Sequence, residues 1–126
     1  MIATSMKRLL IAGFVILALF SGALIAQDNI EKKKIEFLIS SVENLKGAIF
    51  IRNGSEYDGK AAAEHLRMKL KNAGGYVQTA DDFIRLCASK SYITGKPYMI
   101  RLSNGKTIKS EEYFREKLKE YYLTVK

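Results

Sequence analysis

The sequence predicts a small single domain of the α+β class, in which two β-hairpins form an antiparallel sheet packed by about four helices. Asn53-Gly54 and Asn104-Gly105 each lie between short runs of strand-forming residues, and this dipeptide is well suited to a tight hairpin turn. An amphipathic helical pattern follows each hairpin, so a strand-turn-strand-helix plan recurs after 51 residues (104 − 53). Because a lone hairpin is marginal in water, we expect the two to join edge to edge, with helices over one face.

The helical part of the chain opens at residues 29–47, where aliphatic side chains recur at helical spacing and Gly47 can end the helix in the left-handed region. The run Ile49–Ile51 then favours a strand. With a two-residue turn after this strand, Phe50 opposes Tyr57 on one face of the hairpin. The spacing of apolar residues therefore changes from a helical to a strand pattern just after Gly47.

Side-chain caps mark the next two helices. Asp58 is the expected N-cap of a helix over residues 59–72. Thr79, with Asp82 three residues later, resembles a capping box and predicts a short helix over residues 80–89. Each cap provides an acceptor for backbone N–H groups that the first turn of a helix leaves without partners, so both starting points are predicted from local chemistry.

The second hairpin and the last helix complete the plan. Residues 98–102 favour a strand, Asn104-Gly105 a second tight turn, and Thr107-Ile108 the returning strand. Ser110 is the expected N-cap of the final helix. The buried side of that helix is predicted from residues at helical spacing: Phe114, Leu118, Tyr121 and Val125.

The N-terminus has the three parts of a secretory signal peptide. Lys7 and Arg8 form the basic part, and the uncharged run Leu9–Phe20 of 12 residues forms the apolar part. Small residues follow, as a signal peptidase requires. The sequence therefore predicts an exported protein, and the periplasm is the expected location.

Cleavage is expected after Ala23 or Ala26, which makes residues 1–26 the leader and residues 27–126 a single domain. An uncleaved anchor is the alternative, because the uncharged stretch from Leu9 onward is 19 residues long. That length is close to the ~20 residues of a membrane-spanning helix. Membrane contact is expected only in this second case.

Composition restricts the classes of partner. The 126 residues include 21 Lys and Arg against 13 Asp and Glu, a net charge of +8, but these charges are spread along the chain rather than clustered. This spread argues against a nucleic-acid partner and favours a basic, solvated surface near anionic envelope components. Cys87 is the single cysteine and is expected to be a small buried residue. With one His, one Cys and no paired ligands, no metal or other cofactor is predicted.

Two stretches resemble a known family. They are FIRNGSEYDGKAAAEHLRMKL (Phe50–Leu70) and ASKSYITGKPYMIR (Ala88–Arg101). Together they are similar to small exported bacterial proteins catalogued as a domain of unknown function, over about Ile35–Tyr122. The positions that match the family pattern are Phe50, Arg52, Asn53, Gly54, Tyr57, Ala62, His65, Leu66, Lys69, Thr94, Gly95, Pro97 and Tyr98. The resemblance implies an exported bacterial protein and implies no activity.

His65 is the only histidine, and it lies one helical turn before Lys69 on a predicted helix. A histidine can act as a general base or as a ligand because its ordinary pKa is near neutrality. Nucleophilic catalysis would also need a hydroxyl and an acid to orient the ring. The hydroxyl candidates are Ser89, Ser91, Thr94 and Tyr98, of which Ser91 is taken as the example, and the acid candidates are Asp58 and Glu64. No spacing here matches a known mechanism. The structural interpretation is that His65 hydrogen-bonds a neighbouring loop and fixes the helix to the hairpin.

The segment YITGKPY (Tyr92–Tyr98) is the second candidate. Thr94-Gly95 predicts a turn, and tyrosines on both sides of Lys96 suit an anionic or sugar-like ligand, although a simple corner between loop and strand is the structural interpretation. We therefore hypothesise one ligand-binding surface on the first hairpin, the exposed side of the His65 helix and this corner. Its residues are Arg52, Tyr57, His65, Lys69, Thr94, Lys96 and Tyr98.

Three classes of function stay open. The favoured one is a monomeric, non-enzymatic binding or interaction domain of the bacterial envelope, with an acidic or polar ligand. A small hydrolase that uses His65 and Ser91 is the alternative, and a structural partner of a membrane complex is the third.

Overall fold

The structure is a computed structural model in which residues 28–125 are described. The predicted leader, residues 1–26, and its two candidate cleavage sites lie outside this range. None of the helices within the described range combines the length and the hydropathy that a membrane span requires. The unit described below is Glu31–Lys126, in which the elements pack on one another.

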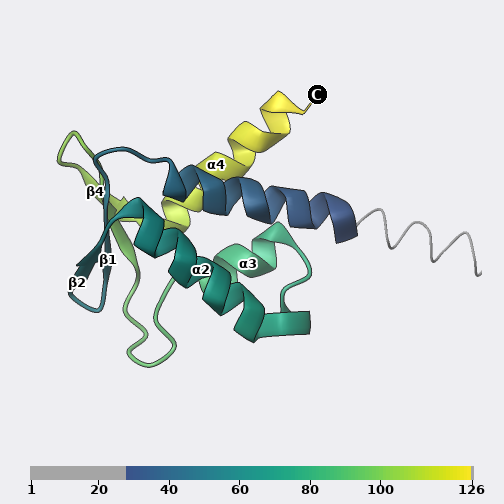
Figure 1. Cartoon of the computed structure of the whole chain (residues 1–126), viewed down its shortest axis with the longest axis horizontal. Coiled ribbons are helices and arrows are strands. Elements are labelled where there is room, and N and C mark those ends of the chain that lie inside the picture. Colours follow the sequence, from purple (N-terminus) through teal and green to yellow (C-terminus); the bar gives the residue numbers. More distant parts are fainter. Residues whose placement is uncertain (1–27, 126) are drawn as a thin grey trace, which may run out of the picture. The chain divides into compact units, whose positions relative to one another are not determined.

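The described residues contain a four-stranded antiparallel sheet in the order β2-β1-β3-β4. Three of its strands, β1, β2 and β4, are labelled in Figure 1. β1 (Ile49–Arg52) and β2 (Ser55–Tyr57) form the first hairpin, and β3 (Met99–Arg101) and β4 (Thr107–Lys109) form the second. The two hairpins join through β1 and β3 at the centre of the sheet. The predicted α+β class and the edge-to-edge junction are therefore confirmed.

A row of apolar side chains crosses all four strands. Phe50 of β1 pairs with Tyr57 on one side and with Ile100 on the other, and Ile100 pairs with Ile108 of β4. Phe50 is 8% exposed and Ile100 is fully buried in the core that the helices share. Since side chains alternate between the two faces of a strand, this row fixes which face of the sheet packs against the helices.

The two hairpin turns differ. Asn53 has φ of 49° and Gly54 φ of 79°, as the predicted two-residue type I′ turn requires. In the second hairpin the Leu102 N–H donates to the Lys106 carbonyl (2.8 Å), which leaves three residues in the loop, and only Gly105 is left-handed there, with φ of 87°. A three-residue loop with one left-handed glycine is the next commonest hairpin connection, so the predicted second tight turn is present, with one more residue in its loop than the first.

A helix occupies residues 28–43 and is called the first helix below; α2 (Gly59–Ala73) and α3 (Ala80–Cys87) follow the first hairpin. The Asp58 side chain accepts a hydrogen bond from the Ala61 N–H at the start of α2. Thr79 and Asp82 form a complete capping box at the start of α3. Both predicted caps are confirmed, because each depends only on groups within three residues of each other.

The last helix, α4 (Ser110–Thr124), begins differently from the prediction. Ser110 is its first residue and is buried, while Lys109 is the N-cap and makes no side-chain capping bond. The Ser110 N–H donates to the Tyr98 carbonyl at 2.8 Å, so the hydrogen bonding of the sheet continues into the first residue of the helix. Val125, predicted on the buried side, is 60% exposed because it follows the last helical residue, whereas Phe114 is buried as expected.

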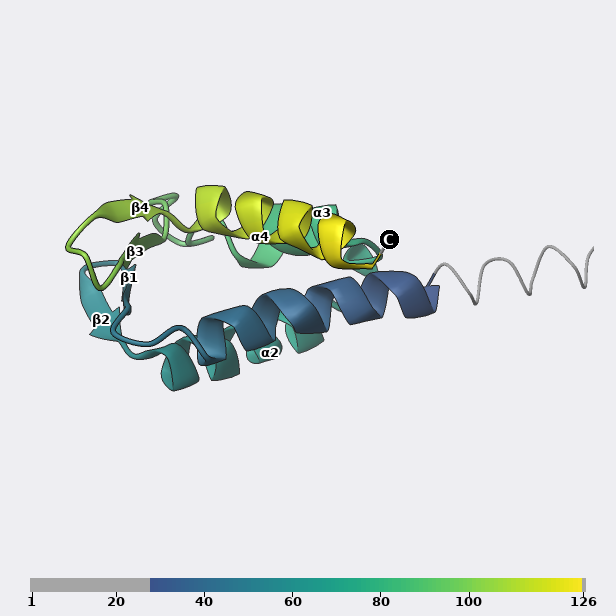
Figure 2. The same ribbon diagram turned by 90° about the horizontal axis from the view of Figure 1, so that it is seen from above.

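The helices form two pairs on the sheet (Figure 2). The first helix lies beside α2, where Arg67 forms ion pairs with Glu36 (3.0 Å) and Glu43 (3.1 Å). α3 lies beside α4, where Asp81 pairs with Arg115. Between the pairs the largest buried side chains meet: Phe83, Phe114, Leu38, Ile39, Ile84, Ile100, Val42 and Cys87. These contacts make one apolar core under the sheet.

Cys87 is 1% exposed within this core, as the sequence predicted. Burial raises the pKa of the Cys87 thiol, so the protonated form is favoured at neutral pH. A buried neutral thiol is a poor nucleophile, which leaves Cys87 as a packing residue.

A buried carboxylate connects the first helix to the C-terminal half of the unit. Glu31 is 6% exposed; its Oε1 accepts from the Ala80 N–H at the start of α3, and its Oε2 lies 2.6 Å from Lys34 Nζ. The hydrogen bond to Glu31 raises the pKa of Lys34, which also donates to the Tyr122 hydroxyl of α4. Because both buried charges are paired, the connection avoids the cost of an isolated buried ion.

The N-terminus of α2 packs closely on the first helix, and this contact gives a test of the fold. A Cβ atom on Gly59 would lie 2.5 Å from the Val42 carbonyl oxygen. Gly59→Ala should therefore lower the free energy of unfolding by about 1–3 kcal/mol, measured by urea denaturation. Gly75→Ala is the matched control, since a Cβ there has no atom within 4 Å, and a change within about 0.5 kcal/mol is expected. Equal stability of the two variants would contradict the packing described here.

Candidate functional site

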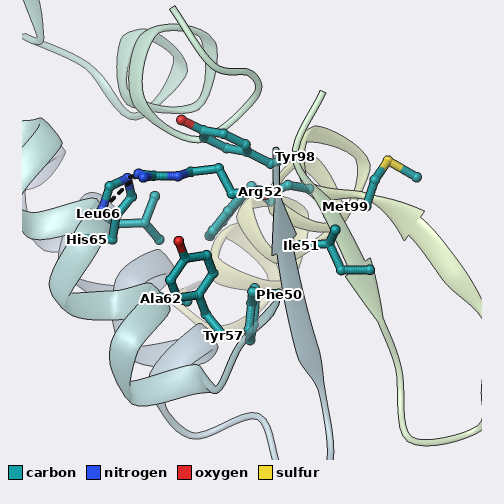
Figure 3. A pocket seen from close by; sticks show the side chains of 11 residues that line it. Phe50, Ile51, Arg52, Tyr57, Ala62, His65, Leu66, Tyr98 and Met99 are labelled. Atoms are coloured by element: carbon teal, nitrogen blue, oxygen red, sulfur yellow. Dashed lines mark hydrogen bonds between the residues drawn. The ribbon is translucent and has the colours of Figure 1, made fainter. Parts of the chain in front are cut away.

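The junction of the two hairpins positions the first pair of site residues. Ile51 of β1 pairs with Met99 of β3 in antiparallel register. Arg52 follows Ile51 and Tyr98 precedes Met99, so the two side chains lie across from each other at one end of the sheet (Figure 3). Arg52 lies two residues after Phe50, and Tyr98 lies two residues before Ile100. Because side chains alternate between the faces of a strand, Arg52 and Tyr98 are on the same helix-covered face as these buried residues.

The helix α2 provides the second pair, one turn apart. The Arg52 guanidinium lies against the His65 ring: its Nη1 is 3.0 Å from Nδ1 and also contacts Nε2 (Figure 3). Lys69 Nζ donates to the Tyr98 hydroxyl at 2.8 Å. Each helical side chain therefore meets one strand side chain. The contact of His65 joins α2 to the first hairpin, as the structural interpretation expected, but through the strand residue Arg52 rather than through a loop.

The imidazole of His65 is held in its neutral form. Burial lowers its pKa, and the positive charges of Arg52 and Lys69 lower it further. A neutral imidazole has one unprotonated nitrogen that can accept a hydrogen bond from a guanidinium, whereas an imidazolium cannot accept one. Among the described residues, no carboxylate hydrogen-bonds to this ring. The arrangement therefore suits a residue that positions Arg52.

The turn of the first hairpin is clamped to the loop that precedes β3. Asn53 Nδ2 donates to Ser91 Oγ (3.2 Å), and Thr94 Oγ1 donates to Asn53 Oδ1 (2.7 Å). Thr94 Oγ1 also accepts from the Lys96 N–H (3.2 Å), within the turn that the sequence predicted. Ser91 is 5% exposed, and in the described part of the chain no hydrogen bond joins it to His65. Its hydroxyl oxygen accepts from Asn53 and from the Thr94 N–H, and so stabilises the loop before β3.

A small cavity of about 40 Å³ lies beneath the Arg52–His65 contact (Figure 3). Its lining is mostly apolar, with Phe50, Leu66 and Phe114 among the residues, and Tyr57 also lines it. One water molecule needs at least about 10–15 Å³ of such space, so the cavity admits only a few atoms. Any larger ligand must bind over Arg52 and Tyr98 rather than inside.

The cations of this region lack carboxylate partners. Within residues 28–125, no Asp or Glu lies within ion-pair distance of Arg52, Lys69 or Lys96, although most other Arg residues of the unit are paired. Lys69 Nζ lies instead 4.7 Å from the centre of the Tyr98 ring and 5.2 Å from that of Tyr92. Cation–π contacts stabilise a charge without neutralising it. We call Arg52, His65, Lys69, Lys96 and Tyr98 the cationic site.

The structure thus brings five of the seven hypothesised binding residues together. Arg52, Tyr57, His65 and Tyr98 line the small cavity, and Lys69 is bonded to Tyr98. Thr94 and Lys96 are exposed in the clamped loop next to the turn.

The sequence did not predict two of the contacts that organise the site. Asn53 was expected only as a turn residue, and its clamp on Ser91 and Thr94 has no local signal. Tyr92, expected beside Lys96, lies against Lys69 instead. Metal binding has no candidate here: among the described residues, no three His, Cys, Asp or Glu side chains are grouped to hold an ion.

Comparison with known proteins places the chain in a family. A family described as being of unknown function, DUF5329, matches residues 29–122. The chain belongs to this family. The uncharacterized protein YfeK of Salmonella typhimurium is 40% identical to this chain over 68 residues. The match covers 54% of this chain and 57% of YfeK, and no solved structure gives a significant match. The DUF5329 assignment confirms the resemblance to a domain of unknown function and adds no activity to it.

The lowered pKa of His65 predicts a pH dependence of stability. Between its folded pKa and the ordinary value of about 6.5, the unfolded chain binds more protons than the folded one. The stabilisation is therefore complete above about pH 6.5 and is lost as the pH falls through that value toward the folded pKa. In His65→Gln the free energy of unfolding should fall less between pH 7.5 and 5.5 than in the wild type, as measured by urea denaturation. Identical pH slopes would show that His65 is not held neutral.

Proposed function

We propose that this DUF5329 protein is an exported, non-enzymatic binding domain of the bacterial envelope, and that its cationic site recognises an anionic group. The observation that supports the proposal most strongly is that Arg52 and Lys69 both bring positive charge to the region of His65, while neither forms an ion pair with a carboxylate among the described residues. Like charges that share one region repel each other, so their grouping favours a carboxylate or phosphate from outside the chain.

Arg52 has hydrogen-bond donors that such a ligand could use. A guanidinium has five N–H groups, and only those on Nη1 contact a protein acceptor within the described residues, the His65 ring. The remaining groups keep the fork geometry that matches carboxylate and phosphate oxygens in pairs. His65 fixes the orientation of this fork from one side, and the Tyr57 ring lies 5.8 Å from the Arg52 guanidinium carbon on another. Fixing the donor in advance reduces the entropy lost on binding.

The alternative of a hydrolase has weaker support. It needs the Ser91 hydroxyl within reach of His65, but this hydroxyl is engaged by Asn53 and by the Thr94 N–H (3.4 Å). His65 faces two cations rather than an orienting acid. Labelling of Ser91 by a serine-directed probe in the wild type, and not in His65→Ala, would favour the hydrolase and contradict a purely binding role.

Export and envelope location rest on the leader pattern at the N-terminus of the sequence. Lys7, Arg8 and the apolar run Leu9–Phe20 direct such a chain to the secretory pathway. A basic domain released there meets anionic lipids, glycans and proteins, which suits the ligand class inferred from the cationic site.

Binding of inorganic phosphate tests the proposal. In NMR titrations of the purified protein, the backbone amides of Arg52, His65 and Lys69 should shift saturably. Arg52→Gln should weaken the affinity about 10-fold or more, because a charge-assisted hydrogen bond contributes about 1.5–3 kcal/mol. Lys71→Gln, an exposed position on the same helix outside the site, is the control and should bind as the wild type does. Absence of saturable shifts, or equal affinities of the two variants, would contradict the proposal.

A further inference from the structure

A second and larger pocket adjoins the cationic site through Lys69, which lines it. Its volume is about 340 Å³, against about 40 Å³ for the first cavity. Small-molecule sites typically measure roughly 300–1,000 Å³, so this one can hold a ring-sized group. We call it the α2–α3 groove, after the helices that form its sides. Its lining consists of Lys69, Asn72, Ala73, Tyr76, Leu86, Cys87 and Tyr92.

Two tyrosines stand exposed at this groove. Tyr76 is 84% exposed and Tyr92 is 72% exposed, although a tyrosine ring would bury a large apolar area if it were covered. Tyr76 lies in the short 3₁₀ turn Gly74–Tyr76 after α2, and Tyr92 lies in the clamped loop. Neither the core nor the sheet uses these rings. Lys69 lies over the Tyr92 ring, and the exposed parts of both rings are therefore available to a ligand.

The groove also contains polar groups that can bind a ligand. Asn72 is exposed, and its side-chain amide has no hydrogen-bond partner within the described part of the chain. It offers two donors and an acceptor. Lys69 lines the groove and also belongs to the cationic site, where its ammonium bonds the Tyr98 hydroxyl. The groove thus combines flat apolar faces, an amide and a positive charge at one end.

We propose that the α2–α3 groove binds one pyranose ring of an acidic saccharide, with the ring against Tyr76 and Tyr92 and its carboxylate toward Lys69. The proposal rests on the proposed function, since Lys69 is common to both sites, and it names the ligand class. A pyranose has one face of C–H groups that packs on an aromatic ring, and hydroxyl groups at its edge that need donors and acceptors such as those of Asn72. A purely aliphatic ligand would cover the Asn72 amide without giving it a hydrogen-bond partner, at a cost in affinity.

NMR titration of the purified protein with matched sugars tests the ligand class. Galacturonic acid and N-acetylmuramic acid present carboxylated pyranoses from uronate polymers and from wall glycan, and galactose and N-acetylglucosamine are their neutral counterparts. We expect at least one acidic sugar to bind about 10-fold more tightly than its neutral counterpart, since an ionic contact contributes about 1.4 kcal/mol or more. The acidic sugar that binds more tightly shows whether the natural ligand is more similar to a uronate polymer or to wall glycan. Equal affinities for acidic and neutral sugars would show that the carboxylate contributes nothing, and would overturn the proposal of an acidic saccharide.

Variants of the groove separate this inference from the anion site. Tyr76→Ala and Asn72→Ala change exposed side chains that form no hydrogen bond with Lys69 among the described residues, so they should weaken the acidic sugar several-fold and leave phosphate binding unchanged. Ile93→Ala is the control, because Ile93 is 95% exposed, adjoins Tyr92 and does not line the groove. Unchanged sugar binding in both groove variants, with phosphate still bound, would overturn the saccharide inference alone.

Two further outcomes are decisive. If neither phosphate nor the acidic sugars bind, the anion site itself fails and the saccharide inference fails with it. Adenosine monophosphate also presents an anion and a flat ring. If this nucleotide binds more tightly than both acidic sugars, and Tyr76→Ala weakens it, the groove recognises a base and the saccharide inference is wrong.

Discussion

The antiparallel pairing of β1 with β3 holds the two hairpins together, and its register determines what the site contains. Ile51 opposite Met99 places Arg52 and Tyr98 on the helix-covered face of the sheet. There Arg52 contacts His65 of α2, and Tyr98 contacts Lys69, one turn later in the same helix. Because a slip of one residue turns every side chain of a strand to the other face, this pairing decides whether the cationic site exists at all.

Local chemistry allowed much of the fold to be predicted. The type I′ turn at Asn53, the cap at Asp58 and the capping box at Thr79 each depend on groups within three residues, and the structure has all three. The errors arose where a distant group intervened. Ser110 does not cap α4, because its N–H takes part in the sheet through the carbonyl of Tyr98, which no local pattern reveals.

The candidate site was predicted in its members but not in its contacts. Polar residues of the two signature stretches do lie together, yet the sequence could not show that His65 meets Arg52, 13 residues away, or that Lys69 lies over two tyrosine rings. Exposed and buried tyrosines look alike in sequence, so Tyr76, one of the tyrosines of the α2–α3 groove, had no signal. Side-chain partners across a sheet depend on register, and register is not a local property.

The register of the central strand pair is therefore the most direct test. Nuclear Overhauser contacts between backbone protons across β1 and β3 should join Phe50 with Ile100 and Ile51 with Met99. Contacts displaced by one residue, such as Phe50 with Met99, would turn Arg52 away from α2. That result would contradict the site, the proposed anion binding and the saccharide inference together.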